Sequence, residues 1–226
     1  MPGPEIVVVG SLNLDLVIEV DHVPIVGETV LGRDLRRVSG GKGANQAVAA
    51  ARLGRRVAMI GRVGDDAAAE TLRGAVDADG VDTTSIITTP ATPSGVALIA
   101  VDADGDNAIV VRPGPNARHT PADIDAAGSP LETAPVTLIQ LEIPLPALDA
   151  AVRRARGRVV LNPAPATPLP DSLLGEVDVL VPNQTELATL AGHQGGVDAT
   201  VAVELCRTLP IESVVVTLGA GGALVV

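Results

Sequence analysis

The stretch Ser39–Gly54, SGGKGANQAVAAARLG, joins a glycine-rich turn directly to a helical pattern. It holds Lys42, the only lysine among the 226 residues, and the run that follows is rich in alanine. Glycines let backbone N–H groups approach a ligand closely, and a helix N-terminus favours negative or oxygen-rich groups. Gly43 follows the lysine where a Walker loop has Ser or Thr. Taken alone, the pattern fits a ligand-binding turn and a plain turn into a buried helix equally well.

Outward from this stretch, short Val- and Ile-rich runs alternate with helical patterns, which predicts βαβ units around a mainly parallel sheet. The predicted strands are Glu5–Gly10, Val57–Val63, Val136–Leu141, Val159–Asn162, Val179–Pro182 and Val214–Leu218. The predicted helices are Ala44–Leu53, Ala67–Ala78, Pro121–Ala127, Leu145–Arg156, Thr185–Ala191 and Asp198–Leu209. The fold class is therefore α/β.

A second set of strands has no helices between paired members. These strands are Leu14–Val20, Glu28–Leu31, Ile86–Thr89, Val96–Val101 and Ala108–Val111. They predict a small antiparallel layer over one face of the main domain, formed by two excursions at about residues 12–38 and 86–112. Between the two excursions, Asp65-Asp66 fits a structural turn better than a catalytic pair.

Composition excludes several classes of partner. The formal net charge of −11 repels polyanions, and no Phe, Tyr or Trp is present to stack on bases, so nucleic acid is not expected to bind. The sequence contains no run of about 18 apolar residues, so no membrane span is predicted. The single Cys206 fits a reducing compartment, and we expect a cytoplasmic protein. The three histidines have no metal-ligand spacing, so no metal site is predicted from them.

Further motifs lie on both sides of the glycine turn. They are VVVGSLNLDLVIEVDHVPIVGET before it, IGRVGDD after it, and then SGVALI, GPN, LIQLEIPL, VVLNPAPA, LVPNQTE and VVVTLGAGGALVV. With them, the whole chain closely resembles the ribokinase-like (phosphofructokinase-B type) carbohydrate kinase family. The resemblance implies a three-layer α/β/α fold with a mainly parallel sheet and a small antiparallel β lid. It also implies ATP- and Mg²⁺-dependent phosphorylation of D-ribose at the 5-hydroxyl, with a homodimer through the lid as a further expectation.

The resemblance also implies two sets of site residues. The sugar-binding set is Asn13, Asp15, Gly41, Lys42, Gly43, Asn45 and Glu142. The nucleotide-binding set is Asn183, Glu186, Thr217, Gly219 and Gly222. Fixed donors and acceptors suit a polyol, because a missing hydroxyl then leaves a buried polar group unpaired. Taken alone, Asn183 and Glu186 are equally the cap and third residue of a helix.

One family element does not occur in the 226 residues. It is the GAGD run, which opens a helix and supplies the aspartate that takes the proton from the sugar hydroxyl; Gly219-Ala-Gly-Gly222 has Gly in place of that aspartate. We therefore assign no catalytic residue and expect an incomplete ribokinase-like domain over residues 1–226, without its C-terminal part. The family's monovalent-cation loop is absent too, and phosphoryl transfer should be absent or strongly impaired.

Two alternatives stay open. The chain could be a non-catalytic, aromatic-free scaffold or fragment that retains sugar binding or only self-associates. It could also be a kinase for another sugar, such as fructose.

Overall fold

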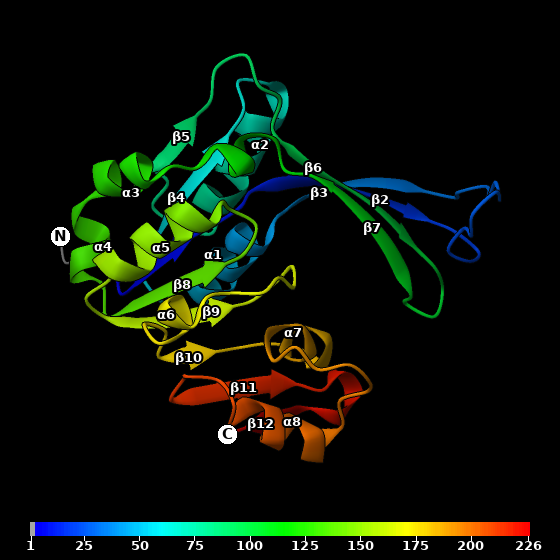
Figure 1. Cartoon of the computed structure of the whole chain (residues 1–226). Helices are drawn as coiled ribbons and strands as arrows, with labels where there is room; N and C mark the ends of the chain where they lie inside the picture. Colours follow the sequence, from blue (N-terminus) through cyan, green and yellow to red (C-terminus); the bar gives the residue numbers. More distant parts are fainter. Residues whose placement is uncertain (1–2) are drawn as a thin grey trace.

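The computed structural model describes residues 3–226 and is built on a central eight-stranded sheet (Figure 1). Its strands are β1 (Ile6–Val9), β4 (Val57–Val63), β5 (Ile86–Thr88), β8 (Val136–Gln140), β9 (Arg158–Asn162), β10 (Val179–Leu180), β11 (Ser213–Thr217) and β12 (Ala223–Val225). They lie in the order β12-β11-β10-β9-β8-β1-β4-β5. All neighbours are parallel except β11 and β12, which confirms the predicted mainly parallel sheet.

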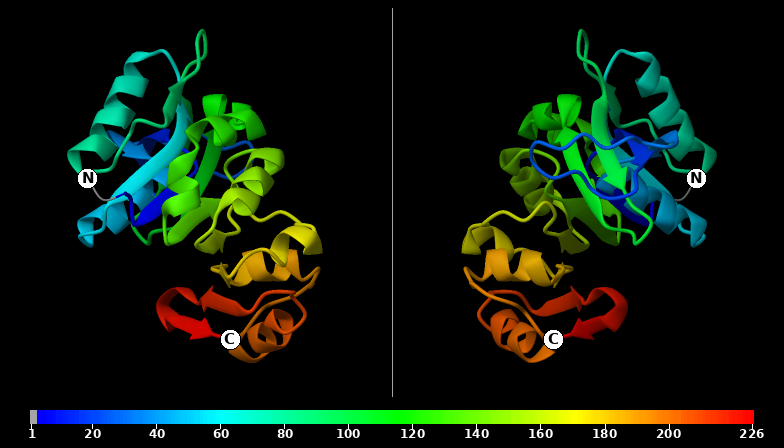
Figure 2. Two further views of the ribbon diagram at one scale, coloured as in Figure 1. Left: turned by 90° about the vertical axis from the view of Figure 1, so that its left-hand side faces the viewer. Right: turned by 90° about the vertical axis from the view of Figure 1, so that its right-hand side faces the viewer.

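Helices cover both faces of this sheet and make three layers (Figure 2). One face carries α1 (Lys42–Arg52) and α2 (Ala67–Ala78). The other carries α3 (Pro121–Ala127), α4 (Ser129–Thr133), α5 (Leu145–Arg154), α6 (Asp171–Leu174), α7 (Gln184–Leu190) and α8 (Ala199–Cys206). Side chains alternate along β1, so Val8 packs with α1 and α2 while Val7 and Val9 pack on the opposite side. Within residues 3–226, no helix is long and apolar enough to cross a membrane.

A second, four-stranded sheet forms the lid and extends away from the body of the molecule (Figure 1). Its strands are β3 (Leu35–Gly40), β2 (Asn13–Glu19), β6 (Gly95–Val101) and β7 (Asn107–Arg112), in the order β3-β2-β6-β7. The pairs β2–β3 and β6–β7 are antiparallel, and the second of them joins the two strands predicted at Val96–Val101 and Ala108–Val111. The two hairpins are joined through a parallel pairing of β2 with β6.

Two strand predictions for the lid were wrong. Residues Glu28–Leu31 form no strand, because the Glu28 carboxylate accepts hydrogen bonds from Ile25 N and the His22 ring and closes a turn. The lid strand instead lies at Leu35–Gly40. Residues Ile86–Thr88 belong to the main sheet, where they follow α2 and pair in parallel with β4. The second excursion therefore begins near Gly95 and not at residue 86.

Asp65 and Asp66 fix the start of β6, which agrees with a structural turn. Asp66 Oδ2 accepts a hydrogen bond from Ser94 N at 2.9 Å, and Asp66 Oδ1 accepts one from Ala69 N at 3.1 Å to cap α2. Asp65 accepts from Thr92 N at 3.2 Å. The connection between β4 and α2 thus holds one end of the lid strand β6 in place.

Candidate functional site

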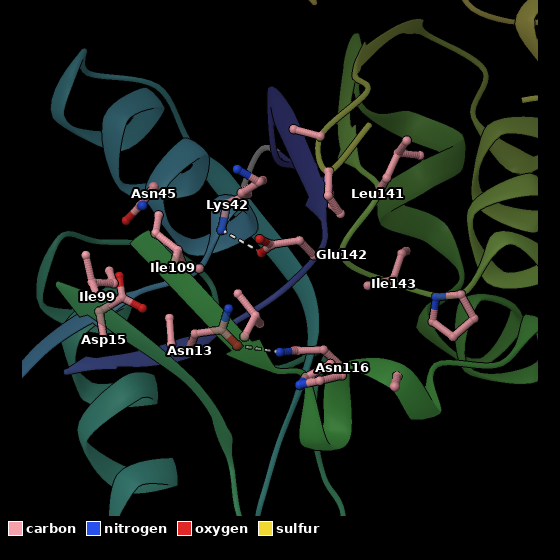
Figure 3. Close-up of a pocket in the computed structure, with 18 of the residues that line it drawn as sticks. Asn13, Asp15, Lys42, Asn45, Ile99, Ile109, Asn116, Leu141, Glu142 and Ile143 are labelled. Carbon is pink, nitrogen blue, oxygen red and sulfur yellow. Dashed lines mark hydrogen bonds between the residues drawn. The ribbon is translucent and has the colours of Figure 1, made fainter. Parts of the chain in front are cut away.

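A cavity of about 770 Å³ lies between the lid and the C-terminal ends of the sheet strands (Figure 3). This is the edge at which open α/β sheets bind ligands. The lid, the start of α1, the segments after β8 and β9, and α7 all contribute to its wall. The residues that line it include Asn13, Asp15, Gly41, Lys42, Asn45, Ala97, Ile99, Ile109, Val111, Asn116, Glu142 and Glu186.

The structure brings most of the predicted sugar-binding residues to this one cavity. They are Asn13, Asp15, Gly41, Lys42, Asn45 and Glu142. Gly43 is the exception, since it is buried behind the cavity wall. A Cβ at Gly43 would lie 2.6 Å from Ser11 N and 2.7 Å from the carbonyl carbon of Gly10. Gly43 therefore lets α1 pack directly against the connection between β1 and β2, and so places its neighbours in the cavity.

Glu142 is held in place from two sides. Lys42 N donates a hydrogen bond to Glu142 Oε2 at 3.1 Å (Figure 3), and the Ser11 hydroxyl donates to the same oxygen. Ser11 Oγ in turn accepts from Gly43 N at 3.3 Å. Within residues 3–226 the other oxygen, Glu142 Oε1, has no such partner, so it can accept from a ligand hydroxyl.

The Asp15 carboxyl has an unusual acidity. Burial and the negative charge of Glu142 together raise its pKa to about 6, against the opposing effect of the Lys42 ammonium. Asp15 is still mainly ionised at neutral pH, where it can accept hydrogen bonds from hydroxyl groups. Two carboxylates and one ammonium thus share a small polar region of the cavity.

The lid supplies an apolar wall opposite these polar groups. Ala97 and Ile99 from β6 and Ile109 and Val111 from β7 line the cavity. The strand pairing places Ala97 opposite Val111 and Ile99 opposite Ile109, so all four share one face of the lid. A wall of this kind excludes water from a bound polar ligand.

The predicted nucleotide-binding residues gather at the ends of β10 and β11, and only Glu186 also lines the cavity. Asn183 and Glu186 form a capping box at the start of α7: Glu186 N donates to Asn183 Oδ1, and Asn183 N to Glu186 Oε2, both at 2.8 Å. Thr217 pairs with Asn183 in an isolated bridge. Gly219 and Gly222, with φ of 57° and 89°, form the following loop. The capping and ligand-binding interpretations of this segment are compatible.

Magnesium would fit this region only together with phosphate groups. Mg²⁺ is usually held by one or two carboxylates plus substrate phosphates. Glu186 offers one such carboxylate beside the cavity. Within residues 3–226, no group of three or more His, Cys, Asp or Glu side chains could hold a metal by itself.

Sequence reasoning missed three contributors to the site. Ser11 fixes Glu142 and is fully buried, and Asn116 contacts both Leu12 and Asn13. The third is the apolar lid wall. The apolar residues along β6 and β7 could have predicted the wall. Ser11 and Asn116, in contrast, contact residues far away in the sequence, which no local pattern shows.

Comparisons with known proteins agree with this geometry. The model of the pfkB family of carbohydrate kinases matches residues 4–226. A ribokinase of Haemophilus influenzae is 39% identical over 223 residues, covering 96% of this chain and 73% of the relative. A deoxyribokinase of Salmonella typhi is 37% identical over 228 residues, covering 97% and 74%. The solved structure of an Arabidopsis thaliana ribokinase complexed with ribose and ATP has a TM-score of 0.84 at 30% identity, covering 99% and 75%.

Proposed function

Since the chain belongs to the pfkB family of carbohydrate kinases, we propose that it binds D-ribose in the cavity beneath the lid and ATP at the neighbouring ends of β10 and β11. The observation that carries the proposal is the convergence of Asp15, Lys42 and Glu142 in that cavity. The reaction of this site is the transfer of the terminal phosphoryl group of ATP to the sugar 5-hydroxyl.

Each polar side chain has a separate task in this proposal. Asp15 and Glu142 accept hydrogen bonds from sugar hydroxyls, while Lys42 and Asn45 can donate to them. Because Asp15, Lys42 and Glu142 are partly buried, a sugar that lacks a hydroxyl leaves one of them unpaired. The apolar wall of the lid then keeps water away from the bound sugar.

The nucleotide phosphates would lie near the loop of Gly219 and Gly222 and the start of α7. Positive φ values at these glycines let backbone N–H groups face a bound anion. Glu186 would hold the magnesium ion, which neutralises phosphate charge when it is bound. Asn183 keeps the Glu186 carboxylate in position through the capping box.

We propose that binding and transfer are separable in these 226 residues. No GAGD run occurs in the sequence, and the three cavity carboxylates have other tasks in this proposal, Asp15 and Glu142 as acceptors for sugar hydroxyls and Glu186 as a magnesium ligand. Loss of a general base typically lowers the rate by about 10²–10⁴. We therefore expect ribose binding with slow phosphoryl transfer.

Titration calorimetry of ribose against the wild type and Asp15→Asn tests the sugar site. The variant should bind ribose roughly ten- to a hundredfold more weakly, because hydrogen bonds to a charged group are worth about 1.5–3 kcal/mol. Asp104→Asn removes an equal charge at the exposed turn between β6 and β7 and should leave the affinity unchanged. Fructose and 2-deoxyribose are titrated alongside ribose.

Wild-type protein that binds none of the three sugars would contradict the proposed site, and tighter binding of fructose or 2-deoxyribose would reassign the sugar. A coupled assay for ADP measures the transfer step separately. Turnover at ordinary kinase rates would show that a base is present after all.

We further propose that two copies associate through the outer face of the lid. Leu35, Leu98 and Val110 lie on that face, away from the cavity, and are 58%, 52% and 67% exposed. Contiguous apolar patches of this kind mark interaction sites. Leu98→Asp should shift sedimentation velocity from dimer toward monomer, whereas Leu53→Asp, at an exposed position after α1, should not. A wild-type monomer at all concentrations would refute the dimer.

A further inference from the structure

Asn116 is a buried amide beside the cavity to which the proposed function gives no role. Only 1% of the residue is exposed, and it lies on the short 3-10 helix η1 (Gly114–Arg118) that follows the last lid strand. We propose that Asn116 is a positioning residue that fixes the direction of the Asn13 amide, so that Asn13 presents a hydrogen-bond donor to the sugar. The proposal rests on the proposed function of the cavity.

The backbone of Leu12 fixes the orientation of the Asn116 amide. Leu12 N donates to Asn116 Oδ1 at 3.1 Å, and Asn116 Nδ2 donates to Leu12 O at 3.0 Å. A backbone N–H can only donate and a backbone carbonyl can only accept. The amide therefore satisfies both groups in one orientation and neither in the flipped one.

This orientation determines that of Asn13. Asn116 Nδ2 lies 2.8 Å from Asn13 Oδ1, and its second N–H requires an acceptor there. The Asn13 oxygen consequently faces Asn116, and its nitrogen points away from that contact (Figure 3). Among residues 3–226, Asn13 Nδ2 has no hydrogen-bond partner, and Asn13 lines the cavity, so this N–H₂ group is free to donate to a ligand.

The neighbouring lid strand leaves room for this pair of amides. Gly95 lies opposite Asn13 in β6. A Cβ at Gly95 would overlap Asn13 Oδ1 and would lie 2.7 Å from Asn116 Nδ2. Any side chain at this position would push the two amides apart. The strand pairing and the amide pair therefore support the same arrangement.

A fixed donor at Asn13 complements the acceptor at Asp15. The two residues lie two positions apart on β2 and so share one face of the strand. One sugar hydroxyl can accept from Asn13 Nδ2 while another donates to Asp15. If the Asn13 amide turned over, two acceptors would stand side by side and the first hydroxyl would lose its donor. Asn116 prevents this reversal without contacting the sugar.

Binding of ribose and of its singly deoxygenated analogues tests the proposal. Calorimetry compares the wild type, Asn13→Ala and Asn116→Asp; the last keeps an acceptor for Leu12 N but removes both donated N–H groups. The wild type should bind the analogue that lacks the Asn13-contacting hydroxyl roughly 5- to 10-fold more weakly than ribose. Both variants should bind that analogue and ribose with equal affinity. They should still bind the analogues that lack one of the other hydroxyls more weakly than ribose, as the wild type does. Asn107→Asp, at an exposed asparagine of β7, is the control and should keep the wild-type profile.

A different pattern would overturn the proposal. If Asn116 only stabilises the fold, Asn116→Asp should weaken every sugar by one common factor and leave all discrimination unchanged. Wild-type protein that binds no sugar would instead count against the proposed function itself, and would leave the amide geometry to be decided by the next measurement.

Nuclear magnetic resonance of the wild type tests the amide direction without any substitution. A scalar coupling across the hydrogen bond from Asn116 Nδ2 to Asn13 Cγ is expected. A coupling in the reverse direction, from Asn13 Nδ2 to Asn116 Cγ, or no coupling between the two, would refute the proposed role even if ribose binds. This measurement also decides the case in which Asn116→Asp does not fold.

Discussion

Replacing Gly41 with alanine is expected to lower the free energy of unfolding by about 3 to 5 kcal/mol and to abolish ribose binding. Gly41 caps α1 with φ of 94° and ψ of 138°, a backbone conformation that side chains strongly disfavour. A Cβ would also lie 2.8 Å from both Asn13 N and Ser11 O and 2.9 Å from Leu12 Cα. All three are backbone atoms, so no side-chain rotation can relieve the clash.

The displacement would reach the proposed sugar site directly. Lys42 N, which donates to Glu142, is the next group along the chain, and Ala44 N donates to Ser11 O at 3.0 Å. Moving the start of α1 would disturb both contacts. Urea denaturation gives the change in stability, and calorimetry with ribose gives the change in binding.

Gly54→Ala is the matched control for this prediction. Gly54 also has a positive φ, 81°, but nothing lies within 4 Å of its ideal Cβ. Its substitution should lower the free energy of unfolding by only about 1–2 kcal/mol, the cost of a left-handed backbone conformation in a residue other than glycine. If Gly41→Ala were no more harmful than Gly54→Ala, the close approach between α1 and the β1–β2 connection would not be what requires glycine there.

Local sequence patterns predicted those parts of the fold that depend on local physics. Short Val- and Ile-rich runs identified the core strands and helical periodicity identified most helices, because the faces that these elements bury must be apolar. The capping pattern was equally informative: Asn183 and Glu186 form the capping box that their spacing implies. These predictions required no knowledge of distant neighbours.

Contacts between segments far apart in the sequence could not be predicted from local patterns. The sequence could not show that Ile86 pairs with Gly61 in the main sheet, because a short apolar strand fits either sheet. Nor could it show that Ser11 would meet Glu142, 131 residues away, or that Asn116 would meet Leu12, 104 residues away. The resemblance to a family pointed to the residues that we propose bind the sugar, whereas the residues that hold them in position emerged only from the structure.

His119 gives the fold a second large and testable sensitivity, this time to pH. Only 3% of the residue is exposed, and neither ring nitrogen has a hydrogen-bond partner among residues 3–226. Burial and, to a smaller extent, the Arg62 guanidinium lower its pKa from 6.5 to about 4, and Asp123 acts in the opposite direction. Asp123 is itself paired with Arg62, with Arg62 Nη2 and Asp123 Oδ1 2.6 Å apart. Its negative charge therefore stabilises a protonated His119 only weakly.

The sign of the effect follows from where each state takes up the proton. Below pH 6.5 the unfolded chain binds a proton at His119, but the folded chain does so only near pH 4. The stability associated with the neutral ring is therefore fully present above pH 6.5 and is lost as the pH falls toward 4. The loss should amount to about 3 kcal/mol.

Denaturation of the wild type and His119→Leu across this range isolates the contribution, because other groups change with pH as well. Asp15 in particular acts oppositely: its raised pKa makes the folded state gain stability as the pH falls from about 6 toward 3.8. That contribution is common to both proteins and cancels in their difference. The wild type should lose more stability than His119→Leu on acidification. Parallel pH profiles for the wild type and His119→Leu would mean that the buried ring does not resist protonation.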